Sequence, residues 1–203
     1  MATINILDAG HGDCILLDFT HTLILIDSGP KEFLIRRSVI TKLKELLSER
    51  AIDIAVVTHN DDDHIGGYEY IISSGIKINR FIFNSLNLIS NIFKTDERQI
   101  SYNQDINLDL YLKEQNISVE TLRWQSEPIV INNIKIIPLT PEISALERMH
   151  NDHLRKTLPQ ISSFEETDQT LYDCINDIFN GNDKFIPDKS ITNRTSLSFI
   201  VEY

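Results

Sequence analysis

Apolar and polar positions divide the first third of the chain into short strands and one helix. Apolar runs at residues 3–7, 14–19 and 22–26 have strand length and short polar connections, which predicts an antiparallel meander. Between residues 31 and 50, apolar side chains recur at spacings of three and four, which indicates an amphipathic helix. Residues 52–57 are rich in β-branched side chains and are typical of a buried strand.

The rest of the chain has a less regular pattern of helices and strands. We expect a helix at 65–74, a strand at 80–84, and helix with a loop near Asn103 between 86 and 115. A hairpin of 128–132 with 135–139 and a helix at 141–157 should follow. The segment 162–189 should be loop-rich with a short helix near 171–179, and a final strand should lie at 196–203. The opening hairpins are antiparallel, so this order predicts an α/β fold with mixed sheets and not a doubly wound parallel sheet.

The composition is that of an ordinary globular domain with a strong acidic bias. The 203 residues suit one domain, and 41% hydrophobic side chains are enough to form a sizeable core. The net charge of −11 argues against a broad basic face that would hold nucleic acid. It leaves open a narrow site in which bound metal ions neutralise phosphates.

The sequence carries no sign of secretion or of a membrane span. Its first residues lack the basic and apolar regions of a signal peptide, and no run approaches the ~20 apolar residues of a membrane helix. Cys14 and Cys174 have no partner at metal-binding spacing, so we expect two buried, reduced thiols. These features predict a cytoplasmic protein without a membrane partner.

Residues 58–67 form a polar motif directly after the expected buried strand. The motif places His59, Asp61, Asp63 and His64 within six residues and ends on a pair of glycines. Imidazole and carboxylate groups together suit zinc, manganese or iron(II). In an extended loop, alternate side chains project to one side, so the first three can converge. Asp63 and His64 are adjacent and should diverge, so they can reach toward a second metal position.

Two metal ions roughly 3.5–4 Å apart could activate a water molecule and stabilise charge on a phosphoryl or carbonyl oxygen. Asp63 is the best candidate for orienting or deprotonating that water, besides contacting metal. Two simpler interpretations remain open, a solvated acidic turn and a calcium loop, although Ca²⁺ seldom takes imidazole. Two histidines with interleaved aspartates, a glycine pair and a preceding strand are more specific than any one of these features.

The motif resembles the His-x-His-x-Asp-His-x-Gly-Gly signature of the metallo-β-lactamase superfamily. Asp61 stands where the second histidine usually lies, a variant that looks like the hydrolase domain of bacterial DNA-uptake (competence) channel proteins. Residues 8–17 resemble the opening segment of that branch, with His11 in place of glutamine. Asp27 lies in a segment that resembles the superfamily's Ile-Asp-x-Gly motif, and residues 193–197 resemble the start of a later core strand.

The resemblance implies an αββα sandwich in which His59, Asp61, Asp63 and His64 bind metal, two Zn²⁺ or Mn²⁺ ions per complete site. It implies that Asp27 supports the metal loop from behind and that His11 lines the site. In the family, a bridging aspartate and a further histidine follow the strand that 196–203 resembles. We therefore expect residues 1–203 to be one incomplete domain, its C-terminal part missing, with a variable region at about 86–190. Residues 149–153 could supply a histidine but are expected on a surface helix.

Three functions follow from these expectations. The first is a metal-dependent hydrolase, a phosphodiesterase or nuclease that acts on nucleic acid or another phosphodiester. The second is a catalytically incomplete module for recognition or coupling within a larger bacterial defence or DNA-handling protein, with a protein partner or a missing C-terminal segment. The third is hydrolysis of a small ester, thioester or lactam, because surrounding loops set substrate choice in such folds.

Overall fold

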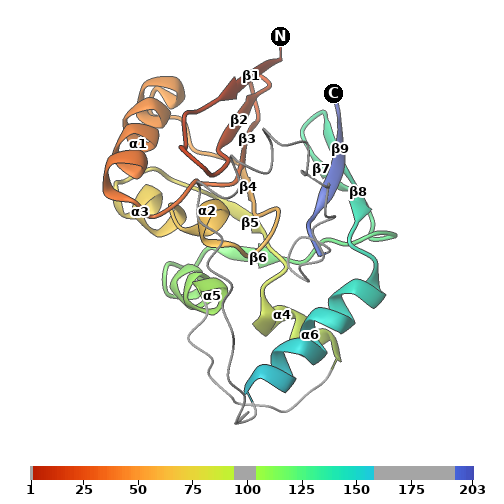
Figure 1. Ribbon diagram of the computed structural model, residues 1–203. Coiled ribbons are helices and arrows are strands. Elements are labelled where there is room, and N and C mark those ends of the chain that lie inside the picture. The colour runs from red at the N-terminus through yellow and green to blue at the C-terminus, as the bar shows by residue number, and fades with distance from the viewer. Residues whose placement is uncertain (1, 94–103, 158–194) are drawn as a thin grey trace, which may run out of the picture.

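The computed structural model describes residues 2–93, 104–157 and 195–203, and the side chains of 2–93, 107–152 and 195–203 (Figure 1). The expectations for the loop near Asn103, for Cys174 and for residues 162–189 lie outside these ranges. The elements are two sheets and a set of short helices. The helices are α1 (Phe33–Leu47), α2 (Asp62–Ile65), α3 (Tyr68–Ser73), α4 (Leu86–Phe93), α5 (Gln104–Glu114) and α6 (Ile143–Thr157).

The first sheet is mixed, as predicted. Its strands lie in the order β1 (Thr3–Ile6), β2 (Ile15–Asp18), β3 (Leu23–Ile26), β4 (Ile54–Val56), β5 (Arg80–Ile82) and β6 (Ser118–Glu120). β1, β2 and β3 pair antiparallel, whereas β3 to β6 pair parallel. β6 is an element that the sequence did not predict, because Val119 is the single apolar side chain among its three residues.

The second sheet has the order β7 (Ile129–Ile131), β8 (Ile134–Thr140) and β9 (Ser198–Glu202), all antiparallel. Its hairpin turns at Asn132, which has a positive φ of 51°, a conformation that asparagine tolerates better than most residues. The predicted hairpin and the predicted final strand are therefore confirmed.

Side chains alternate between the two faces of the first sheet, so each face packs into its own hydrophobic core. Leu16 and Leu25 face the helices α1, α3 and α5, where they pack with Leu43 and other buried side chains. Ile24 and Ile54 face the opposite way and pack against Ile134 and the rest of the second sheet. The molecule is thus layered as helices, mixed sheet and second sheet, and Figure 1 shows α1, α3 and α5 on the side away from β7–β9. The mixed α/β architecture is confirmed.

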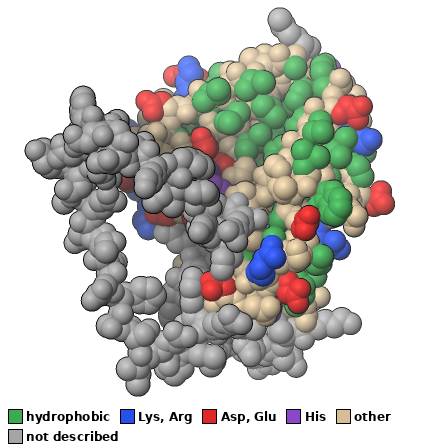
Figure 2. Space-filling model, turned by 45° about the vertical axis from the view of Figure 1, so that its right-hand side comes forward, with side chains coloured by type: hydrophobic (Ala, Val, Ile, Leu, Met, Phe, Trp, Pro, Cys, Tyr) green, Lys and Arg blue, Asp and Glu red, His purple; other side chains and the backbone are tan. Residues whose placement is uncertain are grey.

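The outer face of the second sheet differs from its inner face. Val130, Leu139 and Ile200 are about half exposed or more, at 64%, 45% and 49%. Figure 2 shows many hydrophobic side chains on this side of the molecule.

α4 and α6 pack with each other through Leu86, Ile89, Leu146 and Met149.

Two expectations about the N-terminal half can be checked directly. Cys14 is a free, buried thiol as expected, and burial raises its pKa to about 12, so it stays protonated near neutral pH. The helix expected at 65–74 is present as α3, which starts at Tyr68, and α2, which ends at Ile65 before the glycine pair, was not predicted. In the described ranges, no helix is long and apolar enough to cross a membrane.

Candidate metal centre

The motif loop leaves the first sheet at the carboxyl end of β4. Asp61 is extended, with φ −81° and ψ 148°, and its carbonyl oxygen accepts the backbone N–H groups of His64 and Ile65. A helix therefore starts at Asp62, where acidic side chains in the first turn favour the helix N-terminus. The expectation of an extended loop through Asp63 was wrong, since Asp63 and His64 lie in α2.

The start of α2 brings the four predicted site residues together as two pairs, each of one histidine and one aspartate. The Nε2 atom of His59 lies 3.6 Å from the Oδ2 atom of Asp61, and the Nε2 atom of His64 lies 3.6 Å from the Oδ2 atom of Asp63. The two imidazole rings face each other with centroids 3.7 Å apart and an interplanar angle of 49°. In an extended loop, the neighbouring side chains of Asp63 and His64 would point in opposite directions. In α2 they instead lie close together.

The donor types of this cluster fit a borderline-hard metal such as zinc or manganese. Burial lowers the pKa of His59, and the neighbouring His64 lowers it further, which favours the neutral form that a metal requires. Within the described part of the chain, no group of three or more His, Cys, Asp or Glu side chains has the arrangement of a metal site.

Asp27 holds the cluster from behind, as the resemblance implied. It is buried at the end of β3, with a positive φ of 56°. Its Oδ1 atom accepts the backbone N–H of Thr58 at 2.8 Å, and its Oδ2 atom accepts the Thr58 hydroxyl at 2.6 Å and His64 Nδ1 at 2.8 Å. A carboxylate can only accept, so Nδ1 of His64 carries a proton, and its Nε2 atom lies on the side of Asp63.

Asp27 also controls the charge of His64. Burial alone would lower the pKa of His64, but the hydrogen bond and negative charge of Asp27, together with the charges of Asp63 and Asp13, outweigh burial and raise it. Thr58, which fixes both oxygens of Asp27, is a positioning residue that sequence reasoning missed. In the sequence, the one indication of this role was that Thr58 directly precedes His59.

Backbone hydrogen bonds join the segment after β3 to the motif. Ser28 donates its backbone N–H and its hydroxyl to the carbonyl oxygen of His64, at 2.8 and 2.9 Å. Gly67 donates its N–H to the carbonyl of Gly29 and to the Ser28 hydroxyl. A Cβ atom on Gly67 would collide with the carbonyl oxygen of Ser28, so this position needs glycine.

The opening segment lies against the same helix. A Cβ atom at Gly12 would meet the carbonyl oxygen of Asp63, so the two backbones are in close contact. Asp13, which sequence reasoning did not single out, places its Oδ2 atom 3.9 Å from His64 Nδ1, and its side chain is 66% exposed. His11 is exposed in this loop, and among the described residues it has no hydrogen bond or ion pair to the motif.

One backbone hydrogen bond joins the described C-terminal segment to the motif. Leu197 donates its backbone N–H to the carbonyl oxygen of Thr58 at 2.6 Å. His150 does not lie on a surface, contrary to expectation. It is buried, with its ring stacked on Phe93 and its Nδ1 atom 3.3 Å from the Ser90 hydroxyl. The side chain of His153 and residues 193–194 lie outside the described ranges.

Three solved structures illustrate what the chain is similar to. A diphosphatase from the PhnP family is 21% identical with a TM-score of 0.35, and 62% of this chain aligns with 42% of it. The Bacillus subtilis metallo-beta-lactamase fold protein YhfI is 14% identical with a TM-score of 0.39, with 63% of this chain and 44% of that chain covered. A metallo-beta-lactamase from Pontibacter korlensis is 14% identical with a TM-score of 0.37, with 68% and 54% covered.

The chain spans about half the length of the solved structures that it matches. No curated protein matches it. The comparison with protein families matches one part of the chain, residues 7–78. This part extends from the end of β1 to the segment before β5. These residues include the opening segment, Asp27 and the whole motif, and the family they match is the metallo-beta-lactamase superfamily.

Proposed function

We propose that this chain is a metal-dependent hydrolase domain that cleaves phosphodiester bonds in nucleic acid. The observation that carries the proposal is the cluster of His59, Asp61, Asp63 and His64 over the buried carboxylate of Asp27. The match of residues 7–78 to the metallo-beta-lactamase superfamily, which includes metal-dependent hydrolases, supports it. Asp61 in place of a second histidine favours the branch that resembles DNA-uptake hydrolase domains.

The four side chains of the motif would hold the metal, Zn²⁺ or Mn²⁺. When bound, such ions polarise a phosphoryl oxygen and lower the pKa of a water molecule. Asp63 is about one third exposed and is the proton acceptor that we propose for the attacking water. Asp27 accepts the Nδ1–H of His64 and so leaves Nε2 as the ring nitrogen that would bind a metal, and Thr58 keeps Asp27 in place.

Substitution of His59 or Asp63 by alanine tests the proposal. We expect each variant to lose cleavage of bis-p-nitrophenyl phosphate and of labelled DNA by about a hundredfold or more, without loss of folding. Metal content measured by mass spectrometry should fall in the His59→Ala variant. His21→Ala is the matched control, because His21 is an exposed histidine in the β2–β3 turn. Cleavage that persists in both motif variants would contradict the proposal.

A catalytically incomplete module is the second candidate. The observation in its favour is that no three metal-ligating side chains converge within the described part of the chain. Such a module would bind a partner within a larger DNA-handling or defence protein. Metal analysis discriminates between the candidates, because a module should bind little zinc or manganese and should leave phosphodiester, nitrocefin and thioester substrates intact.

A further inference from the structure

The basic residues of this acidic protein are concentrated in one segment. Residues 31–50 contain six of the chain's 19 Lys and Arg residues but three of its 30 Asp and Glu residues. The segment covers α1 and its two flanks. A strong local excess of one charge sign indicates a surface that meets a partner of the opposite sign.

α1 presents this charge outward. Its apolar stripe, Val39, Leu43 and Leu47, is buried against the first sheet, so the opposite face is left to polar side chains. Phe33 and Leu34 at its start are nevertheless 60% and 77% exposed. An exposed ring beside basic side chains is a feature of surfaces that stack bases and hold phosphates.

An aromatic and guanidinium cluster lies at the start of α1. The guanidinium carbon of Arg36 is 3.6 Å from the ring centre of Tyr70 and 5.5 Å from that of Phe33. Arg36 also donates to the carbonyl oxygen of Lys31 at 3.1 Å, which fixes its position. These planar groups are pre-ordered, so a base that stacks on them loses little of its binding free energy to side-chain ordering.

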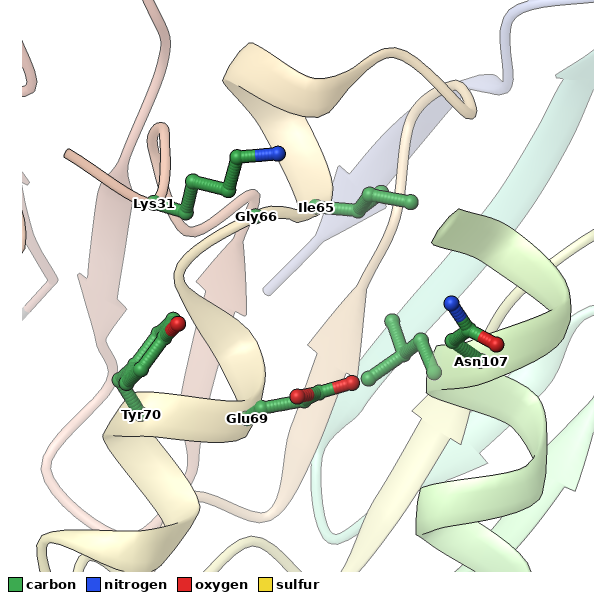
Figure 3. Close-up of a pocket in the computed structure, with 7 residues that line it drawn as sticks. Lys31, Ile65, Gly66, Glu69, Tyr70 and Asn107 are labelled. Atoms are coloured by element: carbon green, nitrogen blue, oxygen red, sulfur yellow. The ribbon is translucent and has the colours of Figure 1, made fainter. Parts of the chain in front are cut away.

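Three hollows with shared lining residues lie along this surface. The first, of about 160 Å³, lies behind α2 and is lined by Lys31, Gly66, Glu69, Tyr70 and Asn107 among others (Figure 3). The second shares Tyr70 with the first and continues along α1 past Arg36 and Arg37. The third shares Arg37 and Thr41 with the second and reaches Lys42. Their linings together extend from the C-terminal end of α2 to the outer face of α1.

We propose that the α1 surface, defined by Lys31, Phe33, Arg36, Arg37, Lys42 and Tyr70, binds single-stranded nucleic acid. This inference rests on the proposed function, since it names the strand form of the substrate and the path along which it is held. α1 has 15 residues and is about 22 Å long, which suits a strand of a few nucleotides.

Ion pairs on the α1 surface decide which of its basic side chains are available to contact a phosphate. Lys31 pairs with Asp62 at 3.3 Å, and Lys42 pairs with Glu45 at 2.9 Å, so both are partly neutralised. Glu69 adds a negative charge at the first hollow. Arg37 is exposed and has no ion pair with the described residues, so it is the main phosphate contact. A lipid surface fits less well, because the apolar stripe of α1 is buried in the core.

A binding experiment in EDTA separates strand binding from cleavage. The probe is a fluorescein-labelled oligothymidylate of about 20 nucleotides, titrated by anisotropy at about 50 and about 200 mM salt. We expect Arg37→Glu to weaken binding about tenfold and to reduce the salt dependence. We expect Phe33→Ala to weaken it about fivefold through lost stacking. Lys77→Glu and Trp124→Ala, both exposed and outside the surface, are matched controls that should leave affinity unchanged.

Equal affinity of the Arg37→Glu and Lys77→Glu variants would overturn the inference. Binding of poly-glutamate or of anionic phosphatidylglycerol vesicles through Arg37, without oligonucleotide binding, would also overturn it in favour of another partner. If the wild type binds the strand through Arg37 but never cleaves it, the inference stands and the proposed function fails. If it cleaves the strand while Arg37→Glu binds normally, the inference alone fails.

Discussion

The two sheets of this molecule differ in how their faces are covered. The first sheet has α1, α3 and α5 on one face and the second sheet on the other, and its central strands are fully buried. The second sheet buries Ile134 and Ile136 on its inner face but leaves Val130 and Ile200 exposed on its outer face. The motif follows β4, the strand buried on both faces, so the candidate site is attached to the most constrained part of the fold.

The largest expected difference between the sheets concerns their leucines. Leu25 in β3 is fully buried, so Leu25→Ala should lower the free energy of unfolding by about 2–5 kcal/mol. Leu139 in β8 is 45% exposed, so Leu139→Ala should change it by about 0.5 kcal/mol or less. Urea unfolding followed by circular dichroism measures both. Equal losses would show that the outer face of the second sheet is covered in solution.

Two buried carboxylates extend the comparison to polar groups. Asp27, behind the motif, uses both oxygens in hydrogen bonds. Asp109 in α5 uses Oδ2 for Asn87 and Lys113, while its Oδ1 atom has no hydrogen-bond partner among the described residues. Asp27→Asn should therefore destabilise the protein by about 2–3 kcal/mol, and Asp109→Asn by about 1 kcal/mol or less. Thermal unfolding of the two variants tests this order, and a larger loss from Asp109→Asn would reverse it.

The smallest expected effect concerns surface ion pairs. Asp18 in β2 makes two contacts with Arg50, the closer at 2.6 Å, and a hydrogen bond from Arg50 is the main reason that its pKa lies below the ordinary value of 3.8. Glu202 in β9 approaches Lys135 at 3.7 Å, and both are exposed. Near neutral pH, Asp18→Asn should cost about 0.2–1 kcal/mol, and Glu202→Gln close to nothing.

The pH dependence of this effect has a definite sign. Because the pKa of Asp18 is lowered on folding, its stabilisation is present above pH 3.8 and is lost as the pH falls through the lowered value. The wild type and the Asp18→Asn variant should therefore converge in stability in acid. Chemical unfolding at a series of pH values checks this. A constant difference across the series would assign the effect to packing and not to charge.

The N-terminal half could largely be predicted from sequence because its signals are local. The apolar run at residues 14–19 and the helical spacing at 31–50 were enough to find β2 and α1. β6 was missed because its position beside β5 depends on long-range pairing of Phe81 with Val119, and its three residues carry no pattern of their own.

The residues of the candidate site were found from sequence, but their arrangement was not. Spacing within the motif identified His59 and His64, whereas the close approach of their tilted rings follows from the start of α2 at Asp62. Asp13 comes near His64 only because Gly12 contacts the backbone of Asp63, a contact between segments far apart in the chain. Such proximity depends on tertiary packing, and sequence spacing alone does not encode it.

The hydrogen bond from Leu197 to the carbonyl of Thr58 has a consequence for biosynthesis. During translation, the residues before the motif emerge early, and β1 to β4 can pair while the later strands are still being made. The carbonyl of Thr58 stays without this partner until residue 197 has left the ribosome. A nascent chain arrested before that point should hold the first sheet and a motif tied to Asp27 and Ser28, with the carbonyl of Thr58 still open to water.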